Sequence, residues 1–247
     1  MLATLGYTSI KGYRVPRVAL IVTGNELRLP SGTLRTGEIH DSNSYALAAA
    51  LRAVGISPTL VLHAPDSRQQ ISKAFSRALK KVDVVVSAGG VSVGDFDFVK
   101  EVLNDLRVKT VFWRIAMKPG KPNYFGTRGA RLVFGLPGNP VSALVSFEML
   151  VMPALRKMMG IHSSEILDSS ATIQSDVRKG AGRIEFVRAI ASRSTDGRLT
   201  VRPVDAQGSH MVGGLAVANC LIIFPKESEL ITNGDVVAIR MLSWNQN

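Results

Sequence analysis

The sequence predicts an α/β domain with a largely parallel sheet flanked by helices, followed by a small all-β domain. Two observations predict this arrangement. Residues 17–159 alternate short apolar β-type runs with segments whose apolar residues recur every three or four positions, which is typical of strand–helix–strand crossover units. After Gly160 the chain changes to short β-rich pieces separated by Gly, Asn, Asp and Pro, which predicts a small antiparallel sheet or barrel.

Each expected element follows from one of these patterns. The strands of the first domain are the apolar runs 17–23, 57–63, 82–88, 108–117 and 131–137. Helical spacing occupies 42–55, 67–81, 97–106 and 140–160. The β-rich pieces of the tail are 171–177, 183–192, 198–204, 220–225 and 235–242. We therefore expect a short N-terminal segment at 1–16, the α/β domain at 17–162, and a β-barrel-like domain at 163–247.

Composition limits the classes of function. The chain has 247 residues, of which 46% are hydrophobic, and a formal net charge of +11. The length and the hydrophobic content allow a sizeable core, and the positive net charge favours anionic partners. Only 6% of the residues are aromatic and the basic residues form no known RNA or DNA motif, so a nucleic-acid partner is disfavoured. No apolar run reaches the roughly 18 residues of a membrane span, and we expect a cytoplasmic protein.

Cysteine and histidine give no sign of a metal cluster. Cys220 is the only cysteine and lies in an apolar stretch, so neither an intramolecular disulfide nor a thiolate cluster can form. The histidines, His40, His63, His162 and His210, show no zinc-ligand spacing. We expect all four to be structural or surface residues.

Loops at the carboxyl ends of parallel strands lead into helices whose free N–H groups favour anions. The first such loop, TGNEL at 23–27, offers Glu26. The second, APDSRQQ at 64–70, places Asp66 three residues before Gln69 at a helix start, which is the pattern of a capping box. Asp66 is therefore predicted first as a helix cap.

The third loop, AGGVSVGDFD at 88–97, is dense in glycine, which lets backbone approach a ligand closely. Asp95 and Asp97 at its end could hold Mg²⁺ against a bound phosphate, and Asp97 could equally cap the helix that follows. Residues 90–94, GVSVG, also match the GxSxG nucleophile elbow of a serine esterase. That alternative places the nucleophile at Ser92, but the acid and histidine it requires are hard to place.

The last two loops carry groups suited to anions. MKPGKPN at 117–123 spaces Lys118 and Lys121 three apart between two prolines, which hold the ammonium groups with little backbone freedom. LPGNPVSALVSF at 136–147 sets Asn139 at the N-cap and Pro140 at the first helical position, with Ser142 just inside. A helix end with so many free amides and so few side chains predicts an anion site.

Taken together, five motifs resemble the molybdopterin molybdenumtransferase family, which comprises the MoeA proteins and the E domains of gephyrin. They are TGNEL, DSN at 41–43, AGGVSVGDFD, MKPGKP and LPGNPVSA, in that order. The resemblance covers about residues 5–247, including the β-rich tail. It implies insertion of molybdate into adenylylated molybdopterin, with divalent-metal-dependent release of AMP.

The resemblance also implies roles for individual residues. Glu26, Asp66 and Asp97 match the family's functional acidic positions, and Asp66 and Asp97 are the expected Mg²⁺ ligands. Molybdate is expected at Lys118, Lys121, Ser142 and Arg188. Molybdopterin and its phosphate are expected at Gly89, Gly90, Val91, Ser92, Gly94, Pro137, Gly138, Asn139 and Pro140.

Members of this family usually carry two further N-terminal domains, and the segment 1–16 resembles the end of that region. The sequence is compatible with a fragment, a misplaced start or a short paralogue. The family implies a homodimer, which packs through parts of those domains, and an active site that includes groups from them. A molybdopterin adenylyltransferase is the other expected partner. Two alternatives stay open: an adenylyltransferase, which normally ends soon after the last helix, and a non-catalytic molybdopterin-binding scaffold.

Overall fold

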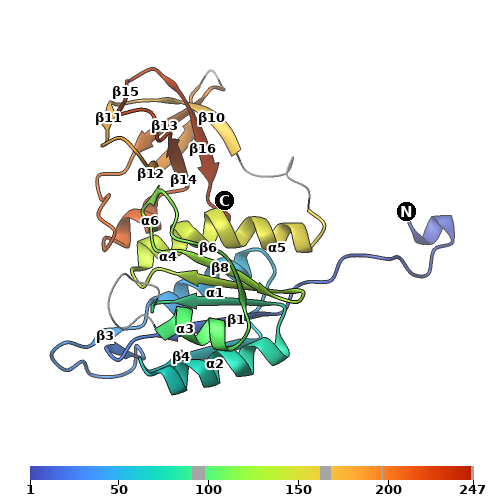
Figure 1. Ribbon diagram of the computed structural model, residues 1–247. Coiled ribbons are helices and arrows are strands. Elements are labelled where there is room, and N and C mark those ends of the chain that lie inside the picture. The colour runs from blue at the N-terminus through green and yellow to red at the C-terminus, as the bar shows by residue number, and fades with distance from the viewer. Residues whose placement is uncertain (91–97, 162–167, 196, 246–247) are drawn as a thin grey trace.

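The computed structural model describes residues 1–90, 98–161, 168–195 and 197–245. A layered α/β domain carries a β-barrel above its long C-terminal helix, and the first residues extend away from the body as an arm (Figure 1). Among the described residues, no helix combines the length and the apolar character needed to cross a membrane.

The α/β domain is built on a six-stranded sheet in the order β4-β1-β5-β9-β8-β6. Four neighbouring strands run parallel: β4 (Leu60–Ala64), β1 (Val18–Thr23), β5 (Val84–Ala88) and β9 (Arg131–Leu136). The next strand, β8 (Tyr124–Arg128), is antiparallel to both β9 and β6 (Lys109–Trp113). The sheet is therefore mixed, which corrects the expectation of a largely parallel sheet.

The antiparallel strand has a local cause that the sequence patterns did not reveal. Only Gly129 and Ala130 separate β8 from β9, and so short a connection can join only antiparallel strands. Gly129 has φ 59°, a left-handed conformation that glycine adopts readily. The run predicted as one strand at 108–117 is also divided, because β6 ends at Trp113 and a separate short strand, β7 (Met117–Lys118), leaves the sheet.

Helices cover both faces of the sheet. One face packs against α1 (Asn43–Ala53), α4 (Pro140–Ser146), the π-helical turn η2 (Phe147–Val151) and α5 (Met152–Met158). The other face packs against α2 (Arg68–Lys81) and α3 (Phe98–Asp105). Alternate side chains of β1 enter the two cores, with Leu20 on the first side and Ile21 on the second. A strand buried on both faces must be apolar throughout, as β1 is.

The barrel closes on itself. Its strands are β10 (Asp168–Ile173), β12 (Ile184–Arg193), β13 (Leu199–Pro203), β14 (Cys220–Phe224) and β16 (Val236–Met241). They follow the order β13-β10-β16-β14-β12, and β12 also pairs with β13, so these five strands form a closed ring. Two short strands, β11 (Val177–Arg178) and β15 (Leu230–Ile231), pair beside it, and a short helix, α6 (Gly213–Val217), precedes β14.

The predicted domain boundary between 162 and 163 lies outside the described residues. Within the barrel, Cys220 is buried, and burial raises the pKa of its thiol to about 12. A protonated interior thiol behaves as a small apolar side chain, which agrees with a structural role for this cysteine.

The contacts that fix the barrel to the α/β domain include a strand pairing and a buried hydrogen bond. Strand β7 adds to β12 in parallel, with Met117 opposite Ile184 and Lys118 opposite Glu185. On the long helix, the buried Glu148 accepts a hydrogen bond from the hydroxyl of Ser243 at 2.6 Å. Burial raises the pKa of Glu148, because desolvation disfavours the charged carboxylate. Strand β7 and the helix that carries Glu148 are thereby both held against the barrel.

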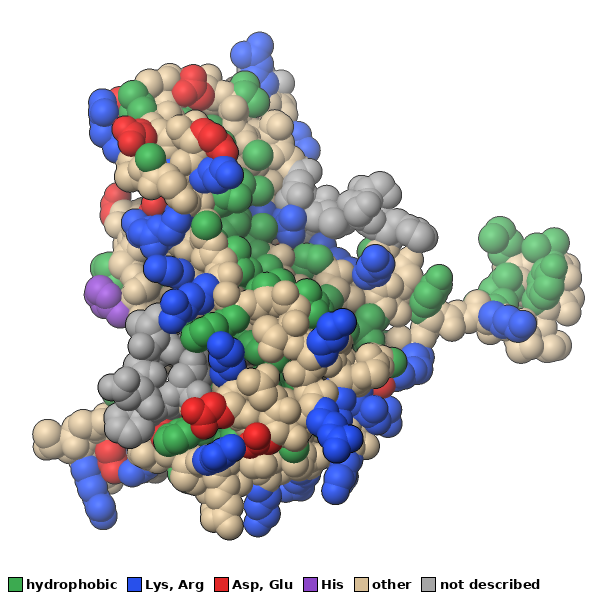
Figure 2. All heavy atoms as spheres, viewed as in Figure 1, with side chains coloured by type: hydrophobic (Ala, Val, Ile, Leu, Met, Phe, Trp, Pro, Cys, Tyr) green, Lys and Arg blue, Asp and Glu red, His purple; other side chains and the backbone are tan. Residues whose placement is uncertain are grey.

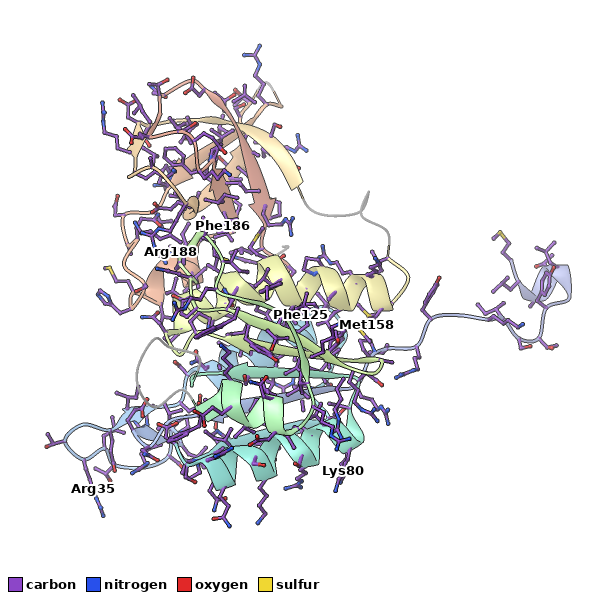
Figure 3. All side chains as sticks on the ribbon, viewed as in Figure 1. Arg35, Lys80, Phe125, Met158, Phe186 and Arg188 are labelled. Carbon is purple, nitrogen blue, oxygen red and sulfur yellow. The ribbon has the colours of Figure 1, made fainter. Side chains whose placement is uncertain are left out.

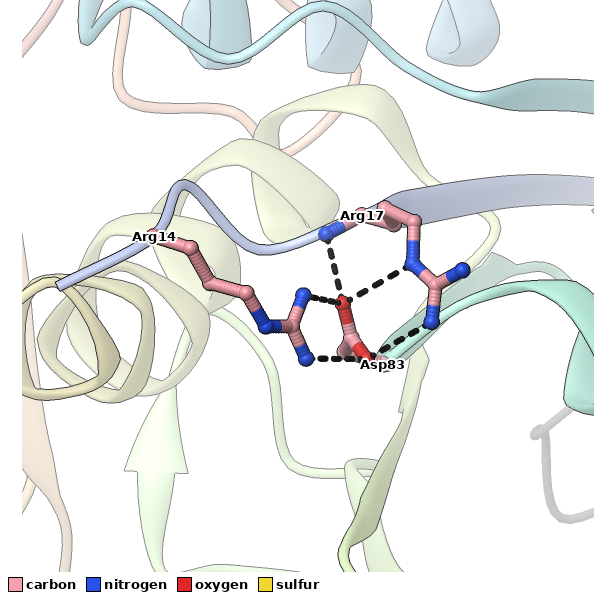
Figure 4. Close-up of polar contacts among 3 residues, drawn as sticks. All are labelled: Arg14, Arg17 and Asp83. Carbon is pink, nitrogen blue, oxygen red and sulfur yellow. Dashed lines mark hydrogen bonds and ion pairs between the residues drawn. The ribbon is translucent and has the colours of Figure 1, made fainter.

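The entry of the chain into the sheet is fixed by a three-residue ionic cluster (Figure 4). Arg14 donates to both carboxylate oxygens of Asp83, at 2.6 and 2.8 Å, and the backbone N–H of Arg17 donates to the same carboxylate at 2.9 Å. The Arg17 guanidinium adds two bonds, at 3.3 and 3.2 Å. These bonds, that of Arg14 first, hold the pKa of the Asp83 carboxyl well below its usual range.

We predict that Asp83→Asn lowers the free energy of unfolding at pH 7 by about 1–3 kcal/mol, because the Asp83 side chain is only 12% exposed and its donors lose a charged acceptor. The folded-state pKa is depressed, so this stabilisation is complete above the unfolded pKa of about 4 and is lost as pH falls below it. Urea unfolding between pH 7 and pH 2.5 measures both effects.

The matched control is Asp105→Asn, which removes an exposed pair with Arg68 and should change the free energy by less than about 0.5 kcal/mol. Equal losses in the two variants, or a difference between wild type and Asp83→Asn that stays constant below pH 4, would contradict the account.

Candidate functional site

The loops that follow β1, β4, β5 and β9 meet at one edge of the sheet and enclose a cavity of about 830 Å³, which we call the edge cleft. Its lining includes residues from all four loops: Glu26, Asp66, Gly89, Gly90, Pro137, Gly138, Asn139, Pro140 and Ser142. The structure thus brings the described members of the predicted acidic and glycine-rich sets into one cavity. Strand ends that share an edge explain this convergence.

The acidic residue of the second loop has a different local partner from the one predicted. Ser67, and not Asp66, caps α2, because its hydroxyl accepts from the N–H of Gln70 at 3.3 Å. Asp66 instead accepts from the N–H of Asn25 at 3.2 Å, and its own N–H donates to the Asn25 side chain at 3.0 Å. These bonds tie the second loop to the first and leave the Asp66 carboxylate in the edge cleft.

Gly89 lets the third loop approach β1 closely, and the fifth loop lies beside it. Gly89 has φ 92°, and a Cβ atom there would lie 2.5 Å from the carbonyl oxygen of Thr23. A Cβ atom on Gly138 would meet the Gly89 backbone at 3.5 Å. Only glycine fits at position 89 without displacing β1. The remaining predicted residues of the third loop, Val91, Ser92, Gly94, Asp95 and Asp97, lie outside the described residues, so the GxSxG serine does too.

The amino end of α4 is arranged much as its sequence predicts. Pro140 is the first helical residue and Asn139 occupies the N-cap position, although the Asn139 side chain makes no capping bond. Its amide group donates instead to the hydroxyl of Ser209 in the barrel domain at 3.3 Å. The Asn43 side chain donates to the carbonyl of Gly138 at 2.7 Å. These bonds hold the turn in place while the first amides of the helix stay available.

Three residues that line the edge cleft each carry a buried side-chain oxygen with no hydrogen-bond partner among the described residues. The oxygens are Thr23 Oγ1, Asn43 Oδ1 and Asn139 Oδ1. An unpartnered buried acceptor is costly, so these oxygens suit a ligand that brings N–H or O–H donors. A fully ionised phosphate brings none and is better matched by the amides of α4.

A second cavity, of about 450 Å³, lies where the barrel meets the α/β domain; we call it the junction pocket. Lys118, Lys121, Ser142 and Arg188 all line it, so the four predicted oxyanion residues do come together. Ser142 lines the edge cleft as well, which makes the two cavities neighbours. Figure 2 shows Lys and Arg side chains gathered at this waist of the molecule.

Arg188 enters the junction pocket from the base of the barrel (Figure 3). The residue is 1% exposed, and its guanidinium donates to the carbonyls of Ala206 and Gly208, the latter at 3.2 Å. Burial lowers its pKa, but an arginine stays protonated at any physiological pH. Among the described carboxylates, none pairs with it. A buried, charged group held only by carbonyls suits an anionic ligand.

Sequence reasoning missed several lining residues. His40 and His210 line the edge cleft, although both were expected to be structural or surface residues. His63 agrees better with that expectation, because its Nε2 lies 2.7 Å from the buried carboxylate of Asp41. No spacing rule could have found His210, since it reaches the cleft from the other domain.

The described residues contain no group of three or more His, Cys, Asp or Glu side chains able to hold a metal. Of the predicted metal pair, Asp66 is described and Asp97 is not. A Mg²⁺ ion commonly takes one or two protein carboxylates and completes its shell with water and substrate phosphates. Asp66 and the exposed Glu26 in the edge cleft are of the right chemical kind for this.

We predict that Arg188→Lys lowers the free energy of unfolding by about 1–3 kcal/mol. The ammonium group of lysine cannot reproduce the hydrogen bonds that the planar guanidinium donates to the carbonyls of Ala206 and Gly208. Affinity for a tetrahedral oxyanion, measured with molybdate as the probe, should fall at least about tenfold. Thermal unfolding and titration calorimetry measure the two effects. Arg202→Lys, at an exposed position of β13, is the control; equal behaviour of the two variants would show that Arg188 has no special role.

Comparison with known proteins agrees with this geometry. Residues 19–157 match the family described as probable molybdopterin binding domain, and residues 170–242 match the MoeA C-terminal region. The chain is 36% identical over 97% of its length to a molybdopterin molybdenumtransferase from Haemophilus influenzae, and 33% identical over 98% to one from Bacillus subtilis. It covers 59% and 56% of these two relatives.

Solved structures give the same result. A molybdopterin biosynthesis MoeA protein from Pyrococcus horikoshii superposes with a TM-score of 0.79 at 29% identity, over 98% of this chain and 58% of that one. The match extends through both the layered domain and the barrel. The chain therefore belongs to the molybdopterin-binding family of molybdenum cofactor biosynthesis, in the branch that carries the MoeA C-terminal region.

Proposed function

We propose that this chain inserts molybdate into adenylylated molybdopterin and releases AMP. The observation that carries the proposal is the junction of the two cavities at Ser142. One cavity presents cationic side chains from both domains, and the other presents helix amides, glycine backbone and carboxylates. A reaction between an oxyanion and a phosphorylated organic substrate needs these two environments side by side.

The chemistry of the two cavities suits different ligands. Molybdate, a dianion, is placed in the junction pocket at Lys118, Lys121, Ser142 and Arg188. The phosphate groups are placed in the edge cleft, against Gly89, Gly90 and the amides that follow Pro140. The unpartnered oxygens of Thr23 and Asn43 suit the N–H donors of a pterin ring. We propose the corresponding roles for Val91, Ser92 and Gly94.

We also propose Glu26, Asp66 and Asp97 as the functional acids, with Asp66 and Asp97 holding Mg²⁺. The ion, when bound, would act as a Lewis acid on the phosphoanhydride. Asp66 is anchored for this purpose by its two bonds with Asn25. The acidic side chains otherwise repel a phosphorylated substrate, so their presence in the same cleft supports a cation between them.

Wider features of the family extend the proposal. We propose a boundary between an α/β domain at 17–162 and a barrel domain at 163–247, a cytoplasmic location, a homodimer, and a molybdopterin adenylyltransferase as the protein that supplies the substrate. The chain spans less than three fifths of the two molybdopterin molybdenumtransferases described above. Its activity must therefore be measured on this polypeptide itself.

The test is AMP release from adenylylated molybdopterin with molybdate and Mg²⁺. We expect Asp66→Asn to reduce the rate at least about 100-fold and leave affinity for the adenylylated substrate within a few-fold, because the carboxylate acts through the metal. Lys121→Met should raise the molybdate concentration needed for half-maximal rate at least about tenfold. Lys80→Met, on the exposed end of α2, is the control.

Substrate binding without AMP release from the wild-type chain would instead assign it to the non-catalytic molybdopterin-binding class. Failure to bind the adenylylated substrate at all would contradict the proposal. Labelling of Ser92 by a fluorophosphonate would favour the esterase alternative.

A further inference from the structure

The junction pocket contains a carboxylate that the proposed reaction does not use. Glu185 Oε1 lies 2.9 Å from the ammonium nitrogen of Lys118, and both residues line the pocket. Their backbones are paired as well, since Lys118 of β7 lies opposite Glu185 of β12. Glu185 thus lies where the barrel pairs with the loop 117–123, which carries Lys118 and Lys121.

The charge inventory of the pocket makes this carboxylate unusual. Its described lining has four cationic side chains, on Lys118, Lys121, Arg183 and Arg188, and Glu185 is the only acid among them. The side chain of Glu185 is 20% exposed and that of Lys118 is 54% exposed. The negative charge is therefore the better shielded member of the pair, and its field acts on any guest in the pocket.

We propose that Glu185 sets the affinity and the charge selectivity of the junction pocket. It pairs with Lys118 when the pocket holds no anion, and it opposes the charge of an anion that enters. This inference rests on the proposed function, in which the pocket receives a tetrahedral oxyanion. Glu185 is a specificity-determining residue and takes no part in the chemical step.

Two effects of opposite sign decide how the Glu185 carboxylate changes the affinity of the pocket for an anion. The ion pair restrains a flexible lysine, and for a half-exposed pair such restraint changes affinity by no more than a few-fold. The repulsion between Glu185 and the guest acts in a half-buried site of low effective dielectric constant and grows in proportion to the charge of the guest. For a dianion the repulsion is the larger effect, so removal of the charge should tighten binding.

Weak binding of the oxyanion before reaction also fits a site that must transfer it to a second substrate. Interactions equally strong before and during reaction lower KM without raising kcat. A pocket with four cations and no opposing charge would hold a dianion more tightly than transfer requires. Glu185 offsets part of that attraction.

The experiment compares two tetrahedral oxyanions that differ in charge, molybdate and perrhenate. Titration calorimetry on the full chain should show that Glu185→Gln binds molybdate about tenfold more tightly and perrhenate about threefold more tightly, because the dianion feels twice the repulsion of the monoanion. Glu185→Ser, which also removes the charge, should change both affinities in the same direction. Glu101→Gln, at an exposed position on α3 that lines neither cavity, should change neither.

Each other result overturns the inference. Weaker binding of both anions by Glu185→Gln would show that the carboxylate serves only to orient Lys118. An equal increase in affinity for the two anions would show that repulsion by the charge of Glu185 is not the cause. If wild type binds neither anion, the oxyanion pocket of the proposed function is itself wrong, which separates that failure from failure of this inference alone.

Discussion

The site depends on the pairing of β7 with β12. Strand β7, Met117–Lys118, begins the loop 117–123 that carries both lysines. It pairs with a strand of the barrel and not with the α/β sheet, so this loop belongs to both domains. The pairing brings Lys118 and Lys121 to the same cavity as Arg188, which is more than sixty residues later in the chain. Without it the cationic side chains would lie on separate domains, and neither domain alone could surround an oxyanion.

The other half of the site depends on close backbone approach at the edge of the sheet. Gly89 lies against the Thr23 carbonyl and near Gly138, so the loops after β1, β5 and β9 meet without intervening side chains. Thr23 and Asn43 then line the same cleft as the first residues of α4. Rigid strands and glycine turns prepare this surface in advance, which reduces the entropy lost when a ligand binds.

Local patterns in the sequence predicted part of this architecture. The apolar alternation of β1 and the spacing of the helices follow from burial, and the family resemblance on five motifs is confirmed by the comparisons. Several other features were not predicted, and most of them are set by tertiary contacts. Ser67 caps α2 because Asp66 has turned to Asn25, β8 reverses the sheet through a two-residue connection, and Glu185 and His210 reach the cavities from the barrel domain. The contacts of Asp66, Glu185 and His210 join segments far apart in the chain, so no local spacing reveals them.

The most direct measurement is the position of a bound oxyanion. Tungstate has the shape and charge of molybdate and scatters X-rays anomalously, so a crystal soaked in tungstate locates it without ambiguity. The account predicts a peak in the junction pocket within hydrogen-bond distance of Lys121, Ser142 and Arg188, and its loss in Arg188→Lys. A peak elsewhere on the basic surface, with the junction pocket empty at saturating tungstate, would contradict the claim that two domains build one oxyanion site.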